Sequence, residues 1–163
     1  MHRRNILKGG LAFVAAGGLY GGTALAATRA PYVTIERTEA EWRAMLTAKE
    51  FEVLREEGTE AKYSSPLLKE TRAGTYHCKG CDLAVYPSDT KYESGTGWPS
   101  FWRALPDAVR TKEDRKLLFY VRTEVHCRRC GSHLGHIFDD GPRPTGKRHC
   151  LNGIALTFRP AAA

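Results

Sequence analysis

The sequence predicts a mainly β domain with mostly antiparallel strands, preceded by two short helices. From Thr75 onward, short runs rich in β-branched and aromatic residues alternate with clusters of Gly, Pro, Asp and Ser. Two helix-capping patterns lie before that point. The 163 residues, of which 42% are hydrophobic and 26% charged, indicate one ordinary globular domain and exclude fibrous or disordered proteins.

The first 26 residues indicate a targeting segment and are set apart from the fold. Arg3 and Arg4 precede an uncharged, glycine-rich stretch that ends in Ala24-Leu25-Ala26, a small-x-small cleavage pattern. We interpret residues 1–26 as a twin-arginine signal peptide, which predicts export through the twin-arginine translocase to the periplasm or cell envelope. The alternative is a membrane anchor, or a tether if the signal stays uncleaved, although six glycines dilute the 18-residue stretch.

Removing that segment lowers the formal charge from +7 to +4, because it carries three basic residues and no acidic one. The remaining charges are interspersed, which argues against a nucleic-acid partner. We expect residues 27–35 to form a leader, residues 36–159 the folded domain and residues 160–163 a tail.

Two capping boxes predict the helices. Thr38-x-x-Glu41 opens a pattern that places Trp42, Met45 and Leu46 on one face, and Thr47-x-x-Glu50 opens a second. The second helix is expected to bury Phe51 and Leu54 and to end at Gly58.

Six strands are predicted in the remainder of the chain, and the Asp-, Pro- and Gly-rich segment 139–146 is predicted to be a loop. The expected strands cover Thr75–Cys78, Leu83–Tyr86, Leu117–Val125, His133–Phe138, Arg148–Asn152 and Ile154–Phe158.

Four of the five cysteines form two C-x-x-C pairs, Cys78/Cys81 and Cys127/Cys130. Two such turns complete a tetrahedral site of four thiolates, so we predict one structural Zn²⁺ ion. The alternatives are disulfides, which an exported protein can form, and a redox-active pair. A twin-arginine substrate folds before export, which favours zinc loaded in the cytoplasm.

Cys150 is the cysteine outside these pairs. A lone cysteine is usually a small buried hydrophobe. If residues 148–152 are extended, however, Arg148, Cys150 and Asn152 project from one face, whereas His149 points to the other. The cation would stabilise a thiolate and the amide could bind a polar substrate, so we predict a reactive thiol.

Three further motifs make a family resemblance specific. They are Ser94-Gly95-Thr96-Gly97-Trp98-Pro99-Ser100-Phe101, Ser132-His133-Leu134-Gly135-His136-Ile137-Phe138-Asp139-Asp140-Gly141-Pro142, and Arg148-His149-Cys150-Leu151-Asn152. Together with the two cysteine pairs, this order closely resembles the B-type methionine sulfoxide reductases, the SelR family, which act on the R epimer at sulfur. The resemblance runs from about Glu41 to Phe158.

The resemblance implies two antiparallel sheets in a barrel-like arrangement, a zinc site away from the active site, and Cys150 as the catalytic nucleophile. It also implies that Trp98 and Phe101 line the substrate pocket with Arg148 nearby, and that His133, His136 and Asn152 flank the sulfoxide. The chemistry needs such a set, because an acid must protonate the departing oxygen while a thiolate attacks sulfur. His136, with His133, suits the acid role, and each histidine could instead be an ordinary core residue.

Two positions depart from the family pattern. Many members have a resolving cysteine where this chain has Thr96, so we predict that an external thiol or a thioredoxin-like partner reduces the oxidised Cys150. The residue before the catalytic cysteine is usually Tyr, whereas this chain has His149, which leaves the role of that position open.

The expected substrate is oxidised methionine, in proteins or free, and the expected enzyme is a monomeric peptide-methionine (R)-S-oxide reductase. One rival hypothesis is a non-catalytic zinc module that binds nucleic acid or protein. The other is a different thiol oxidoreductase or a peroxidase. Neither explains the Trp98 motif, and comparing turnover of both sulfoxide epimers and hydrogen peroxide separates the enzymes.

Overall fold

A computed structural model describes residues 34–117 and 120–162 of the chain. The predicted signal peptide and nearly all of the predicted leader lie outside these residues. None of the described helices is long and apolar enough to cross a membrane.

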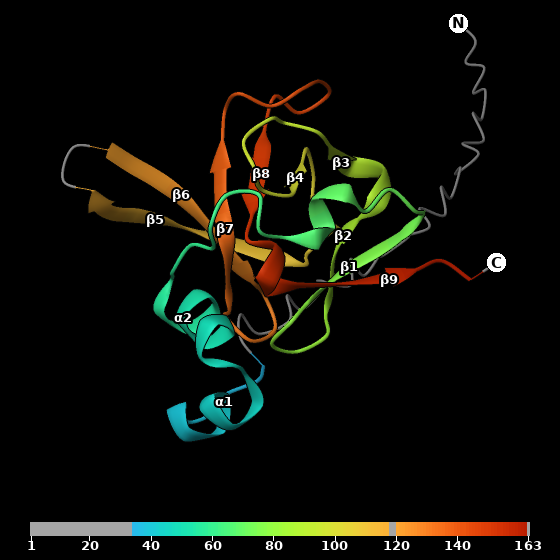
Figure 1. The fold of residues 1–163 in the computed structure, drawn as a ribbon. Coiled ribbons are helices and arrows are strands. Elements are labelled where there is room, and N and C mark those ends of the chain that lie inside the picture. The colour runs from blue at the N-terminus through green and yellow to red at the C-terminus, as the bar shows by residue number, and fades with distance from the viewer. Residues whose placement is uncertain (1–33, 118–119, 163) are drawn as a thin grey trace, which may run out of the picture. The chain divides into compact units, whose positions relative to one another are not determined.

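Both capping boxes are present and start the helices where the sequence predicted. α1 spans Glu39–Met45 after the N-cap Thr38, and α2 spans Ala48–Glu56 after the N-cap Thr47. In each box the threonine oxygen accepts a bond from the N3 amide while the N3 glutamate accepts one from the cap amide. In Figure 1 the two helices lie together, and α2 packs against β7 (His133–Phe138).

Two details of the helix prediction are wrong. Met45 is 54% exposed, because α1 is short and its buried face carries Trp42. Gly58 does not end the second helix, since Glu57 itself adopts the left-handed conformation at the C-cap, with φ of 59°. The Glu57 N–H donates to the carbonyl of Glu52, which ends the helix one residue early.

The strands form two antiparallel sheets, which confirms the predicted fold class. Neither sheet of the described residues closes on itself, so the barrel-like arrangement is not a closed barrel. The first sheet has the order β2-β1-β9, with β2 at Ala84–Pro87, β1 at Gly74–Cys78 and β9 at Leu156–Pro160. The second has the order β3-β4-β8-β7-β6-β5, at Lys91–Tyr92, Ser100–Phe101, Arg148–Leu151, His133–Phe138, Tyr120–Cys127 and Val109–Leu117 (Figure 1).

The predicted strand at His133–Phe138 has the observed bounds, whereas the other five differ, two of them (β1 and β2) by no more than a single residue at either end. The predicted Leu117–Val125 strand is the second arm of a hairpin whose first arm, β5, was not predicted. The predicted Ile154–Phe158 strand starts later, because Gly153–Ala155 forms a 3-10 helix. Asn152 leaves the sheet at the same point, since it is the N-cap of that helix.

The core lies between the two sheets and is bridged by aromatic rings. Phe101 of β4 meets Tyr76 of β1 edge-on, with ring centroids 4.9 Å apart, and lies 4.8 Å from the ring of Tyr86 in β2. All three side chains are fully buried. Because each ring removes a large apolar area from water, this cluster helps to hold one sheet on the other.

Candidate active site

Cys150 lies in an interior strand of the six-stranded sheet. β8 pairs with β4 on one side and with β7 on the other, so Cys150 stands opposite Ser100 and opposite His136. Its neighbour His149 points to the opposite face, as predicted, where its Nδ1 lies 2.9 Å from the Tyr86 hydroxyl. Burial lowers the pKa of His149 to about 4, so this ring is neutral and belongs to the core.

A cavity of about 130 Å³ opens beside the Cys150 side chain. It brings together four of the predicted residues, although they come from separate segments of the chain. The cavity is lined by Thr59, Trp98, Arg122, Gly135, His136, Phe138, Cys150, Leu151 and Asn152. Its size suits the end of one side chain rather than a large cofactor.

The floor of this cavity includes bare main chain at Gly135. A Cβ atom added there would lie 2.1 Å from the carbonyl oxygen of Cys150 and 2.9 Å from Cα of Leu151. No side chain fits at that distance, so the glycine lets β7 and β8 approach closely beneath the thiol.

Two opposing effects set the charge of Cys150. Burial raises the pKa of its thiol above the ordinary value of 9.0, whereas the Arg148 cation and the Thr96 hydroxyl, 4.0 Å from Sγ, act to lower it. The predicted cation, Arg148, is therefore present, but its effect on the pKa of Cys150 is smaller than that of burial. The Arg148 guanidinium also pairs with Asp140, whose two carboxylate oxygens accept hydrogen bonds from its Nε at 2.9 Å and its Nη2 at 2.8 Å. The resting Cys150 is a neutral thiol at pH 7.

His136 is held by an acidic residue for which no role was predicted from the sequence. Its Nε2 lies 2.8 Å from Oδ2 of Asp114 on β5, and the same oxygen lies 2.5 Å from Nη2 of Arg122 on β6. Burial lowers the pKa of His136 below 6.5, although the bond to Asp114 opposes this shift. A neutral His136 therefore donates from Nε2 to the carboxylate, which leaves Nδ1 as a proton acceptor.

His133 does not line the cavity but lies behind His136, with ring centroids 5.3 Å apart. It is 2% exposed, and its Nδ1 lies 2.9 Å from Oε1 of the buried Glu124. His133 therefore packs against the His136 ring, and its buried Nε2 atom has no hydrogen-bond partner among the described residues.

The side chains of Asn152 and Trp98 form two walls of the cavity, and both make hydrogen bonds to the main chain. The Oδ1 atom of Asn152 accepts from the Glu60 N–H at 2.9 Å, and its Nδ2 donates to the carbonyl of Leu134 at 3.4 Å. The indole N–H of Trp98 donates to the carbonyl of Glu60 at 3.1 Å. These bonds fix the amide orientation of Asn152 and leave one of its two N–H groups for a ligand.

The sequence-based placement of Phe101 in the pocket is wrong. Successive residues of a strand face opposite sides of a sheet, and Phe101 pairs with His149 while Ser100 pairs with Cys150. Phe101 therefore shares the core face with His149, is fully buried, and does not line the cavity.

The other four cysteines gather at a second place, formed by the turn after β1 and the turn between β6 and β7. Their sulfur atoms all lie within 4.8 Å of one another. The Cys78–Cys130 and Cys81–Cys127 sulfur pairs are each 3.6 Å apart, far beyond the ~2.05 Å of a disulfide. A tetrahedral ion with bonds of about 2.3 Å would separate its sulfur ligands by roughly 3.8 Å, so this group fits a metal site.

The main chain of both cysteine pairs follows the same course. The residue after the second cysteine has a positive φ in each, 58° at Asp82 and 68° at Gly131. Its N–H donates to the carbonyl of the first cysteine, at 2.8 Å in one pair and 2.9 Å in the other. These turns bring the sulfurs of both pairs together, in the arrangement in which four thiolates share one metal ion.

Comparison with known proteins decides the family. Residues 46–160 match the model of the SelR domain. The chain belongs to the SelR family. Among its relatives are proteins named peptide methionine sulfoxide reductase MsrB, from Methanosarcina barkeri (50% identical over 77% of this chain and 88% of that protein) and Pseudomonas putida (46% over 77% and 95%). A third, from Leptospira interrogans, is 43% identical over 77% of this chain and 95% of that protein.

The SelR family is an enzyme family, and its matched segment contains the complete pocket and all five cysteines of this chain. The sequence resemblance is thereby confirmed at the level of the family. No functional role was predicted for Arg122, Asp114 or Thr59. The fold brings Thr59 and Arg122 to the lining of the pocket, and the pairing of β5 with β6 brings Asp114 within hydrogen-bond distance of His136.

Proposed function

We propose that this chain reduces methionine-R-sulfoxide to methionine, with Cys150 as the nucleophile. One observation carries the proposal: in a SelR-family chain, the Cys150 thiol, the His136 imidazole and the Trp98 indole line the same small cavity. A nucleophile, a proton carrier and an apolar wall are what sulfoxide reduction needs.

The proposed reaction balances with one proton. The Cys150 thiolate attacks the sulfoxide sulfur, the S–O bond breaks, and the oxygen ends on Cys150 as a sulfenic acid. The substrate sulfur gains two electrons and leaves as a thioether, while the cysteine sulfur loses two. The departing oxygen takes the proton.

His136 is proposed to move that proton. Cys150 and His136 are directly opposite each other on neighbouring strands, and both side chains enter the cavity, so they lie on one face of the sheet. The neutral imidazole takes the proton of the neutral thiol, and the resulting imidazolium, stabilised by Asp114, donates it to the oxygen. This transfer supplies the thiolate that burial otherwise disfavours.

The walls are proposed to orient the chiral sulfur. The Trp98 ring gives the S-methyl group an apolar surface, and the remaining N–H of Asn152 provides a donor for the sulfoxide oxygen. Only one epimer can place its methyl on the ring, its oxygen near Asn152 and His136, and its sulfur against Cys150 at once.

Regeneration is proposed to use an external thiol or a thioredoxin-like protein. The four other cysteines are gathered in one metal-type site, and Thr96 lies beside Cys150. Two thiol groups from outside reduce the sulfenic acid to the thiol, with release of water and formation of a disulfide in the reductant. We propose Zn²⁺ as the ion of the four-cysteine site, where it would be held by Cys78, Cys81, Cys127 and Cys130 and would supply structural crosslinking.

We expect wild-type enzyme with dithiothreitol to turn over methionine-R-sulfoxide at least about a hundredfold faster than the S epimer. Hydrogen peroxide should be consumed no faster than in a Cys150→Ser control. Chromatographic separation of the two epimers gives both rates, and mass spectrometry of alkylated enzyme reports any disulfide. Equal rates for the epimers would contradict the proposed walls, and an intramolecular Cys150 disulfide formed in turnover would contradict the external reductant.

The pH dependence of the reduction rate should follow the fraction of enzyme in which both the Cys150 thiol and the His136 imidazole are neutral. The pKa of His136 lies below 6.5 and that of Cys150 above 9.0, so the reactive thiol–imidazole pair predominates between these values. We expect the single-turnover rate of pre-reduced enzyme to be nearly flat from pH 6.5 to 9.0. It should fall at lower pH as His136 is protonated, and at higher pH as Cys150 loses the proton that His136 must deliver.

Single-turnover conditions keep the titration of the reductant out of the profile. In His136→Asn the rate should be much lower and should no longer fall on the acid side. A wild-type rate that climbs about tenfold for each pH unit between 7 and 9 would instead show attack by free thiolate without transfer to the imidazole.

A further inference from the structure

Glu60 joins two walls of the cavity that come from distant parts of the chain. Its backbone N–H donates to Oδ1 of Asn152 at 2.9 Å, and its backbone carbonyl accepts the indole N–H of Trp98 at 3.1 Å. One peptide segment therefore sets both the amide and the ring against which a substrate must lie. Glu60 itself does not line the cavity.

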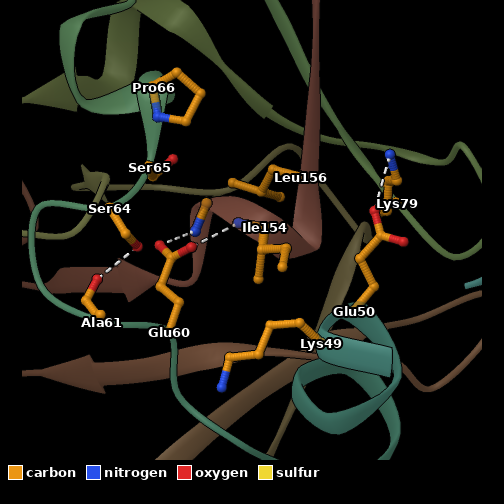
Figure 2. A pocket seen from close by; sticks show the side chains of 11 residues that line it. Lys49, Glu50, Glu60, Ala61, Ser64, Ser65, Pro66, Lys79, Ile154 and Leu156 are labelled. Atoms are coloured by element: carbon orange, nitrogen blue, oxygen red, sulfur yellow. Dashed lines mark hydrogen bonds and ion pairs between the residues drawn. The ribbon is translucent and has the colours of Figure 1, made fainter. Parts of the chain in front are cut away.

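The Glu60 side chain anchors that segment. Glu60 is 6% exposed, and its Oε1 and Oε2 accept the N–H groups of Gly153 at 2.6 Å and Ile154 at 2.9 Å. Figure 2 shows the carboxylate turned toward the chain at Ile154, across the neighbouring surface pocket. A buried carboxylate with two amide donors is a charge-assisted contact and among the stronger hydrogen-bonding arrangements.

The same contact explains why Asn152 can serve the cavity. Asn152 is the N-cap of the 3-10 helix Gly153–Ala155, where an asparagine side chain ordinarily accepts from the first amides of the helix. It makes no such bond here, because Glu60 takes those amides. The glutamate thereby releases the Asn152 side chain to turn toward the active site.

Close packing holds the segment in place on this turn. A Cβ atom added at Gly153 would lie 1.9 Å from Oγ of Ser65 and 3.3 Å from Oε1 of Glu60. The chain after Glu60 therefore lies directly on the turn after Asn152, without room for a side chain between them.

We infer that Glu60 is a positioning residue for sulfoxide binding. It holds the side chains of Trp98 and Asn152 in the correct positions relative to Cys150. This inference rests on the proposed function. It assigns Glu60 no contact with substrate, so its effect must pass through the two walls.

Glu60→Gln tests the inference. The amide keeps one acceptor oxygen but turns an NH₂ group toward one of the two backbone donors, so one bond is lost and a donor faces a donor. We expect kcat/KM for methionine-R-sulfoxide to fall roughly thirtyfold, mainly through KM, and the preference for the R epimer to narrow.

Glu50→Gln is the matched control. Glu50 lines the same surface pocket, and its carboxylate accepts from the Thr47 N–H at 2.8 Å and pairs with Lys79 at 3.2 Å (Figure 2). It has no contact with Trp98, Asn152 or Cys150 among the hydrogen bonds and ion pairs of the described residues. We expect this variant to lose some thermal stability but to keep the wild-type KM and epimer ratio.

Hydrogen exchange of the Trp98 indole N–H gives a readout that does not depend on activity. The chain has three tryptophans, and a Trp98→Phe sample assigns the signal. Exchange at Trp98 should be faster in Glu60→Gln than in wild type or Glu50→Gln. Glu60→Asp keeps the charge and provides a second folded variant should the glutamine variant fail to fold, with an intermediate KM expected.

The outcomes separate this inference from the proposed function. If the wild type is active and both Glu60 variants keep its KM, epimer ratio and rate of indole exchange, the positioning role is overturned and the proposed function stays intact. Inactive wild type overturns the proposed function, and with it the role of Glu60 in sulfoxide binding. Faster indole exchange in that case would still show that Glu60 holds Trp98.

Discussion

Replacing Cys150 with serine is expected to lower turnover of methionine-R-sulfoxide by at least about three orders of magnitude. Serine retains the size of the side chain but not a nucleophile that can accept an oxygen and be reduced again by thiols. The measurement is methionine released from the R epimer, with dithiothreitol as reductant and enzyme concentrations high enough to detect the residual rate.

The control for this variant is its stability. Cys150 is only partly buried and is not one of the four clustered cysteines, so Cys150→Ser should melt within a few degrees of wild type. A folded Cys150→Ser protein that keeps more than about a tenth of the wild-type rate would remove Cys150 from the mechanism. It would favour a non-catalytic module or a different nucleophile.

Removing metal from the four-cysteine site is expected to have the largest effect on stability. Structural zinc sites bind with about 10–16 kcal/mol at pH 7, which is comparable to the whole stability of a domain of this size. We expect Cys127→Ser, or wild type stripped with a strong chelator, to be largely unfolded at 37 °C or to melt at least roughly 15 °C lower. Circular dichroism melts with and without added Zn²⁺ provide the measurement.

Cys150→Ser is the matched control for metal removal as well, since it deletes a thiol outside the cluster. It should bind one zinc ion per chain by elemental analysis and show the same chelator response as wild type. A metal-free wild-type protein with an unchanged melt, or disulfides joining the four cysteines in purified protein, would contradict the structural zinc site.

The sequence predicted those parts of the fold that depend on local signals. The capping boxes at Thr38 and Thr47 determine helix starts through bonds within four residues, and they were located correctly. β5 was missed because Arg110, Lys112, Glu113, Asp114 and Arg115 make it too polar to read as a strand. Its extended conformation comes from pairing with β6. The two-residue strands β3 and β4 are too short to leave any pattern.

The candidate site shows the same division. Cys150, His136, Trp98 and Asn152 were singled out because each lies in a recognisable motif, and they line one cavity. Phe101 was misplaced because the side of a strand that faces a cavity depends on register, and one residue changes the face. Asp114 and Glu60 could not be found, since their contacts with His136 and with the turn after Asn152 join residues 22 or more positions apart.

The bare main chain at Gly135 has a consequence for how specificity can evolve. A floor made of backbone offers no side chain to exchange, and the contact with Cys150 leaves no space to add one. Selection can therefore reshape the cavity only through the side chains that line it, at positions such as Thr59, Trp98 and Phe138. The position of Cys150 beside this floor is therefore inherited with the pairing of β7 and β8, whereas the width of the cavity is open to mutation.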